Sequence, residues 1–188
     1  MSDAARRHED ASEPAKHDDA ALDAAGNAER GVSTDAAVQF PAGSFTSTGE
    51  AETFALGEHI GRRLAGGETL LLDGPLGAGK TVFVKGLAAG LGVDTGEVSS
   101  PSFTLVNRYD GGRLTLYHLD LYRLPQGAAA AHAVDLDDLL SDERAVIVVE
   151  WAERMGNYRL PPPVLKVSIA GDGEEPRRIS IRPVSVLN

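Results

Sequence analysis

The segment with the clearest chemistry in this sequence is a glycine-rich run that ends in lysine and threonine. Residues 74–81 satisfy the pattern G-x-x-x-x-G-K-[ST] in full. In such a loop the glycines let backbone N–H groups turn inward around phosphate oxygens, and the positive end of the following helix adds to the attraction. Lys80 would reach the β- and γ-phosphates of a nucleotide, and the hydroxyl of Thr81 would bind Mg²⁺. The motif therefore predicts a site for a nucleoside triphosphate.

Two acidic residues near the ends of predicted strands are candidates for catalysis. Asp120 shares one face of an alternating strand with two leucines and a histidine, where a carboxylate needs a cation or hydrogen-bond donors. Mg²⁺ would supply the cation; pairing with an arginine such as Arg123, or solvation on an open sheet face, is the alternative. Glu150 ends an apolar strand, as a Walker B acid does, although an ordinary acid at a solvated strand end fits too. We predict Lys80, Asp120 and Glu150 as catalytic residues, and Thr81, Asp120 and Glu150 as the metal site.

Three other features have two interpretations each. The hydroxyl-rich segment 99–104 could sense the γ-phosphate as a switch, or could be a plain turn before a strand. Trp151 could stack on the base or pack in the core. His118 could assist at the site, although a core histidine bonded to the backbone is the favoured interpretation. The predicted nucleotide-binding residues are Gly74, Leu76, Gly77, Ala78, Gly79, Lys80, Thr81, Val82, Ser102, Thr104 and Trp151.

The elements on either side of the loop are those that the motif requires. Residues 69–72 form a short apolar run, which is typical of a strand buried on both faces. Residues 82–91 repeat apolar side chains at helical spacing, and Gly90 and Gly92 are predicted to help end this helix. The order strand, loop, helix makes the phosphate-binding interpretation specific.

The rest of the chain predicts a mixed sheet. Turn residues at 110–112 indicate a hairpin between strands 103–106 and 114–121. Other predicted elements are a helix over 49–65 with a capping box at Ser47 and Glu50, a helix over 135–140, a strand over 145–149, and a closing hairpin of strands 164–169 and 178–181. The predicted fold class is α/β: a P-loop NTPase-like sheet, parallel near the phosphate loop and antiparallel at the hairpins, flanked by helices.

The first 38 residues differ in composition from the rest. They hold nine acidic and four basic side chains, few large aliphatic residues and no aromatic ring. Such a segment cannot bury enough surface to offset the entropy of ordering, so we predict a disordered, alanine-rich tail at 1–38 and a P-loop ATPase domain at 39–188. An acidic docking arm, or a helix formed on binding, is the functional alternative for the tail.

Composition limits the classes of function. The 188 residues, 19.8 kDa in mass, suit one principal domain, and the net charge of −10 argues against broad nonspecific binding of nucleic acid. The absence of cysteine excludes disulfides, thiolate metal sites and a cysteine nucleophile, and agrees with a cytoplasmic location. No apolar run approaches the roughly 18 residues that span a bilayer, so no membrane partner is expected.

Other classes of nucleotide-using protein fit less well. Residues 107–110 have the outline of a guanine-reading motif, but arginine replaces lysine and no D-x-x-G switch lies between the phosphate loop and these residues, which disfavours a GTPase. A small-molecule kinase would need a lid with arginines, and residues 124–132 contain none; this class remains the alternative enzyme. A noncatalytic ATP-dependent scaffold is the third possibility.

Four segments of the sequence form a distinctive combination: GPLGAGKT at 74–81, VSSPSFTLV at 98–106, LYHLDLYRL at 116–124 and VEWAER at 149–154. Taken together, they resemble the TsaE (YjeE) family, bacterial P-loop ATPases of tRNA threonylcarbamoyladenosine modification. The resemblance covers about residues 46–181 and none of the tail. It implies that ATP hydrolysis with Mg²⁺ supports a transfer complex of TsaD-like and TsaB-like subunits that acts on A37 of tRNA. The chain would reach tRNA indirectly, through that complex.

The resemblance also implies roles for individual residues. Lys80 and Thr81 match the phosphate and Mg²⁺ residues of the family. Asp120 matches the acid near the metal and γ-phosphate, and Glu150 matches the second acid. Trp151 is expected near the nucleotide, and the switch-like segment is expected to include Ser102 or Thr104.

Overall fold

The structure, a computed structural model, describes residues 42–171 and 176–184. The tail predicted at residues 1–38 lies outside these ranges. The described elements are β1 (Gly43–Ser47), α1 (Glu50–Gly61), β2 (Thr69–Asp73), α2 (Lys80–Leu91), β3 (Val106–Tyr109), β4 (Thr115–Asp120), α3 (Ala128–His132), α4 (Leu136–Leu140), β5 (Ala145–Glu150), the 3-10 helix η1 (Ala152–Met155), β6 (Val164–Ala170) and β7 (Arg177–Pro183).

The strands form one mixed seven-stranded sheet in the order β1-β7-β6-β2-β5-β4-β3. β2 pairs in parallel with both β5 and β6, and β5 pairs in parallel with β4. The outer pairs β1–β7, β6–β7 and β3–β4 are antiparallel. The predicted fold class is therefore confirmed. Because β2 lies at the centre, the loop after it has β5 and β4 on one side and β6 and β7 on the other.

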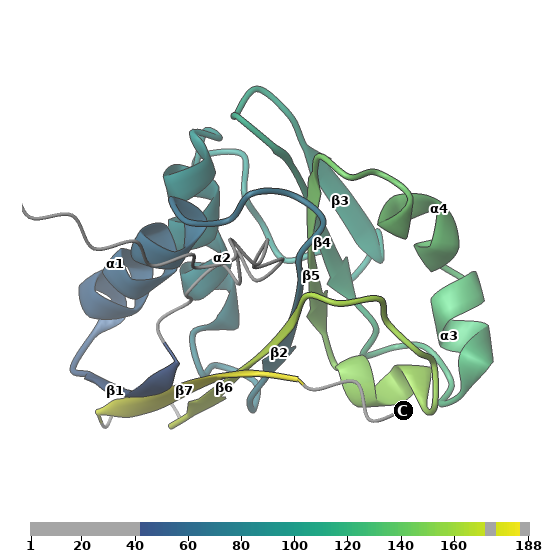
Figure 1. Ribbon diagram of the computed structural model, residues 1–188. Coiled ribbons are helices and arrows are strands. Elements are labelled where there is room, and N and C mark those ends of the chain that lie inside the picture. Colours follow the sequence, from purple (N-terminus) through teal and green to yellow (C-terminus); the bar gives the residue numbers. More distant parts are fainter. Residues whose placement is uncertain (1–41, 172–175, 185–188) are drawn as a thin grey trace, which may run out of the picture. The chain divides into compact units, whose positions relative to one another are not determined.

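Helices cover the two faces of this sheet (Figure 1). Leu116 of β4, and Leu114 just before the strand, belong to the core that packs against α1 and α2. Leu119 of β4, and Leu121 just after the strand, belong to the core on the opposite face, with α3, α4 and η1. The alternation predicted for this strand is confirmed, because successive side chains of a strand point to opposite faces.

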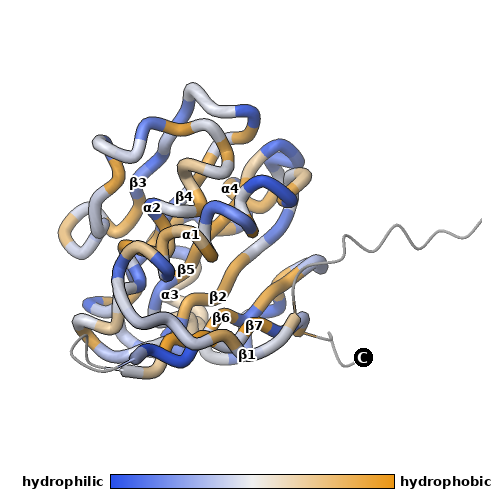
Figure 2. The backbone as a smooth tube through the Cα atoms, turned by 90° about the vertical axis from the view of Figure 1, so that its left-hand side faces the viewer, coloured by the Kyte–Doolittle hydropathy of each residue, from blue (hydrophilic) through white to orange (hydrophobic). Residues whose placement is uncertain are grey.

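The central strands β2 and β5 are mainly hydrophobic. All six residues of β5 are buried, including its terminal glutamate, and β2 is apolar at its three central positions. Figure 2 shows the middle of β2 in orange. Within the ranges that the structure describes, no helix combines the length and the apolar character needed to cross a bilayer.

Four glycines bring α1 and α2 into close contact. A Cβ atom placed on Gly86 would lie 2.1 Å from the carbonyl oxygen of Phe54, and one on Gly90 would lie 2.4 Å from that of Glu58. Gly57 and Gly61 of α1 meet the α2 backbone as closely. The prediction that Gly90 helps to end the second helix is therefore wrong, because Gly90 serves packing inside α2. The helix ends at Gly92, whose φ of 82° suits glycine.

The prediction of a strand over residues 103–106 is also wrong. Leu105 has a φ of 66°, and its N–H donates to the carbonyl oxygen of Pro101 over 2.7 Å, which closes a turn. Extended structure begins only at Val106. The hairpin itself is present, but its first strand is displaced toward the turn.

The start of the first helix differs from the predicted capping box. Gly49 is the N-cap and no side chain caps it. Ser47 is buried at the end of β1, where its hydroxyl lies 2.8 Å from the hydroxyl of Thr53 and donates to the carbonyl of Gly49. The N–H of Thr48 donates to the carboxylate of Glu52 instead. The strand β1 and the helix α3 were not predicted.

Candidate active site

The phosphate loop joins β2 to α2, and its glycines adopt backbone conformations that other residues rarely adopt. Gly74, Gly77 and Gly79 have φ values of 152°, 81° and 99°. A Cβ atom on Gly74 would lie 2.4 Å from the carbonyl oxygen of Ile169, so no larger residue fits there. Gly79 directly precedes the first residue of α2, whose opening N–H groups lack intrahelical partners. The loop and this helix end together form a cradle suited to phosphate oxygens.

Lys80 lies inside this cradle. Its Nζ donates to the carbonyl oxygens of Gly74 and Pro75, over 2.9 Å and 3.0 Å. It also lies 3.7 Å from Glu150 Oε2 and 5.1 Å from the centre of the Trp151 ring. The ammonium group is thus fixed between the loop backbone and the carboxyl end of β5.

Asp120 is buried with donors on both carboxylate oxygens. The hydroxyl of Ser102 donates to Oδ2 over 2.6 Å, and the backbone N–H of Tyr122 donates to Oδ1 over 3.0 Å. The side chain is only 4% exposed, which excludes solvation on an open sheet face. Arg123 forms no ion pair with Asp120 in the described part of the chain; its guanidinium lies over the ring of Phe103. The switch-like segment therefore contacts this acid directly through Ser102.

Glu150 is buried between two nitrogen donors. Its Oε1 lies 2.9 Å from Nε2 of His118, and its Oε2 faces Lys80. Glu150 is 4% exposed and His118 is fully buried. The favoured interpretation of His118, a core residue bonded to the backbone, is wrong, because its hydrogen bond goes to a site carboxylate. The alternative of an ordinary solvated acid at the end of β5 is excluded as well.

These residues meet in one pocket of about 250 Å³. Its lining residues are Glu50, Leu76, Gly77, Gly79, Lys80, Thr81, Val82, Ser100, Ser102, Asp120, Tyr122, Glu150, Trp151 and Arg177. The structure thus brings all three predicted catalytic residues to the phosphate loop, together with Thr81. Trp151 lines the pocket with its ring 4.9 Å from that of Tyr122, centre to centre.

Three residues predicted for nucleotide binding do not line the pocket. Thr104 is exposed and its hydroxyl donates to Asn107, away from the loop. Ala78 is buried beneath the loop, and Gly74 contributes the carbonyl that holds Lys80. The lining residues that sequence reasoning missed are Glu50, Tyr122 and Arg177, and Ser100 was included only as part of the segment 99–104. Tyr122 lies two positions after Asp120, inside the segment 116–124, so that motif could have indicated it. No local pattern indicates Glu50 or Arg177.

The donor set fits Mg²⁺ held largely by a nucleotide. The described residues contain no group of three or more His, Cys, Asp or Glu side chains that could hold a metal by themselves. Mg²⁺ is usually bound through one or two carboxylates, waters and substrate phosphates rather than by a protein cage. Thr81, Asp120 and Glu150, grouped at one phosphate cradle, fit that form of binding.

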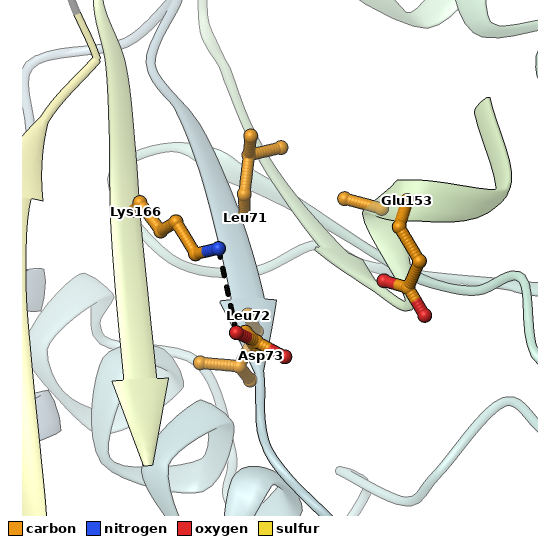
Figure 3. Close-up of a pocket in the computed structure, with 6 residues that line it drawn as sticks. Leu71, Leu72, Asp73, Glu153 and Lys166 are labelled. Carbon is orange, nitrogen blue, oxygen red and sulfur yellow. Dashed lines mark ion pairs between the residues drawn. The ribbon is translucent and has the colours of Figure 1, made fainter. Parts of the chain in front are cut away.

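A second, larger pocket of about 340 Å³ lies beside β2, β6 and η1 (Figure 3). Its charged groups include Lys166 and Asp73, whose Nζ and Oδ2 lie 3.4 Å apart. Figure 3 shows this pair between neighbouring strands, with Glu153 of η1 apart from it. The pocket contains no residue of the phosphate loop, so its greater volume does not make it the active site.

The central parallel strands, the loop and the buried acids define an α/β protein of the P-loop class. Comparison with known families then narrows the class. The family "Threonylcarbamoyl adenosine biosynthesis protein TsaE" matches residues 47–179, and the chain belongs to this family.

Individual relatives agree with this assignment. The chain is 40% identical over 132 residues to a Nostoc sp. protein named "tRNA threonylcarbamoyladenosine biosynthesis protein TsaE", which covers 70% of this chain and 80% of that protein. It is 41% identical over 134 residues to the Treponema pallidum protein of the same name, covering 69% and 93% of the two chains. The crystal structure of Bacillus subtilis YdiB superposes with a TM-score of 0.59 at 32% identity, covering 76% of this chain and 85% of that one.

Proposed function

We propose that this chain is the Mg²⁺-dependent ATPase of the machinery that forms threonylcarbamoyladenosine at A37 of tRNA. It hydrolyses ATP in the cytoplasm beside TsaD-like and TsaB-like subunits, which carry out the transfer itself. The observation that carries the proposal is the meeting of Lys80, Asp120 and Glu150 at one phosphate loop, in a chain of the TsaE family.

Different residues of the pocket have different roles in phosphoryl transfer to water. The loop N–H groups and Lys80 bind the phosphate chain and stabilise the charge that develops on it. Thr81 and the nearby carboxylates would hold Mg²⁺, which when bound would neutralise phosphate charge. Glu150 orients the attacking water, since Lys80 and His118 hold its two oxygens in fixed positions. Asp120, held by Ser102, links the metal side of the site to the switch-like segment.

Exposed apolar side chains around the pocket support a protein partner. Among the described residues, the exposed large apolar side chains are Leu76 at 70%, Phe103 at 86% and Tyr122 at 44%. Leu76 and Tyr122 line the pocket, and Phe103 follows Ser102, which lines it too. Grouped exposed apolar residues mark interaction surfaces. A partner seated here would cover the nucleotide, and the chain's net charge of −10 favours contact with protein over direct contact with tRNA.

The test measures ATP turnover by the full chain with Mg²⁺, alone and with a purified TsaB–TsaD pair. The wild type is expected to turn over slowly alone and faster with the pair. Asp120→Asn and Glu150→Gln are each expected to lower turnover by at least about 100-fold while retaining nucleotide binding. Asp110→Asn is the matched control, because Asp110 is an exposed acid in the hairpin turn.

Other outcomes would identify another function. No hydrolysis in any mixture, together with intact tRNA modification in a depleted strain, contradicts the proposal. Hydrolysis that requires a metabolite and yields its phosphorylated form would identify a small-molecule kinase. Normal ATP binding and full complementation by Asp120→Asn or Glu150→Gln would identify a noncatalytic scaffold.

A further inference from the structure

Arg177, the first residue of β7, is a buried arginine beside the phosphate loop. It is 6% exposed, and its Nε has no hydrogen-bond acceptor among the described residues. A Cβ atom placed on Gly79 would lie 3.3 Å from this Nε, so the guanidinium lies against the loop backbone. The side chain lines the same pocket as Lys80 and Thr81. A buried guanidinium is costly unless an anion or another acceptor faces it.

The order of the strands places Arg177 across the loop from the catalytic acids. β2 lies between the β6–β7 side of the sheet, which carries Arg177, and the β5–β4 side, which carries Glu150 and Asp120. Glu150, Asp120 and Lys80 mark the end of the pocket where the γ-phosphate must lie. A nucleotide that places its γ-phosphate there extends its nucleoside end toward the β6–β7 side of the loop, where Arg177 lines the pocket.

We propose that Arg177 binds the phosphate chain of the nucleotide at its nucleoside end, through guanidinium N–H groups that donate to α-phosphate oxygens. This inference rests on the proposed function and adds a binding residue to it. The planar guanidinium matches phosphate oxygens in charge and in spacing. Because ATP and ADP share the α-phosphate, Arg177 determines the affinity for both nucleotides and takes no part in cleaving the γ-phosphate.

The test is direct binding of MgADP and of Mg²⁺ with a non-hydrolysable ATP analogue to the full chain, measured by titration calorimetry. Arg177→Gln is expected to weaken both affinities equally, by about 10- to 100-fold, because a charge-assisted hydrogen bond is lost. Arg177→Lys keeps the charge but loses the planar guanidinium, so its affinities are expected to lie between those of the wild type and those of Arg177→Gln. Arg178→Gln is the matched control, since Arg178 is exposed on the same strand, and its binding should equal that of the wild type.

A melting curve separates a binding role from a structural one. Arg177→Gln should melt at the wild-type temperature or above it without nucleotide, because a buried unpaired charge has been removed. MgADP should raise its melting temperature by less than it raises that of the wild type. If Arg177→Gln does not fold, Arg177→Lys decides by the same two measurements.

The possible results are distinguishable. Equal loss of ADP and ATP-analogue affinity supports the assignment. Unchanged binding by the Arg177 variants, or loss confined to the ATP analogue, overturns it and leaves the proposed function intact. Failure of the wild type to bind either nucleotide overturns the proposed function and this assignment with it.

Discussion

At the scale of single residues, the contact between His118 and Glu150 has a consequence for catalysis. His118 is fully buried on β4, and its Nε2 is within hydrogen-bond distance of Glu150 Oε1 on β5. The two strands pair in parallel with His118 opposite Val148 and Asp120 opposite Glu150, so His118 lies on the same face of the sheet as Glu150, two positions before it in the register. His118 thus positions the carboxylate that is proposed to orient water, without touching the nucleotide itself.

We expect His118→Phe to lower ATP turnover by about 10- to 100-fold, the usual cost of losing a partner that orients a functional ligand. The MgADP affinity should stay within about twofold of the wild type, because the residue does not line the pocket. Steady-state turnover and calorimetric binding check this separation of kcat from affinity.

Two further variants make this prediction specific. His118→Gln retains a side-chain N–H donor and should recover part of the lost turnover. His132→Gln changes an exposed histidine of α3 and should have no effect. Equal turnover of His118→Phe and the wild type would show that Glu150 needs no such partner.

At the scale of elements, the α1–α2 contact tolerates no side chain at its glycines. Gly86→Ala would gain about 1 kcal/mol of helix propensity but would place its methyl group 2.1 Å from the Phe54 carbonyl oxygen. We expect the clash to prevail and to lower the free energy of unfolding by about 1–3 kcal/mol. Urea denaturation measures this loss. Gly49→Ala is the control, since a Cβ atom there meets nothing within 4 Å, and a stabilised Gly86→Ala variant would contradict the close contact.

A hydrogen bond connects the segment after η1 to α4: the hydroxyl of Tyr158 donates to Asp137 Oδ1. Burial, and then this hydrogen bond, raise the pKa of Tyr158 to about 12. The folded-state pKa lies above the ordinary value of 10.0, so the contribution to stability is complete below that value and is lost as pH rises through 12.

Tyr158→Phe is therefore expected to lower the free energy of unfolding by at most about 1 kcal/mol at pH near 8, because the hydroxyl is partly solvated. The difference between wild type and variant should shrink between about pH 10 and about pH 12. Denaturant unfolding across this range, with Tyr122→Phe as an exposed control, measures it. A difference that stays constant across the range would contradict the coupling.

At the scale of the whole molecule, the family match does not include the first 38 residues. The match begins at residue 47, and the described residues that line the pocket at the phosphate loop lie between Glu50 and Arg177. We expect a variant lacking residues 1–38 to retain the wild-type melting temperature, nucleotide affinity and ATP turnover. If the only change is a loss of activation by the TsaB–TsaD pair, the tail is a docking arm. If the shortened chain does not fold, the predicted domain boundary is contradicted.

Much of the fold could be read from the sequence because its signals are local. The strand before the phosphate loop, the loop and the helix after it are contiguous, and each has its own pattern of apolar residues and glycines. The predictions failed where contacts with other parts of the chain override local preference. Gly90 has the pattern of a helix terminator, but it packs against α1. The segment before Val106 has an extended pattern, but Leu105 closes a turn and its carbonyl oxygen accepts a hydrogen bond from the N–H of Asp120.

Sequence patterns were sufficient to predict the phosphate loop, the mixed α/β class and the three candidate residues Lys80, Asp120 and Glu150. The side chains that contact these residues became known only from the folded arrangement of the strands. Contacts of Ser102 with Asp120 and of His118 with Glu150 depend on strand order and register. Arg177 reaches the loop from β7, far along the chain. No local pattern encodes such contacts, because they arise when the sheet brings separate segments to one edge.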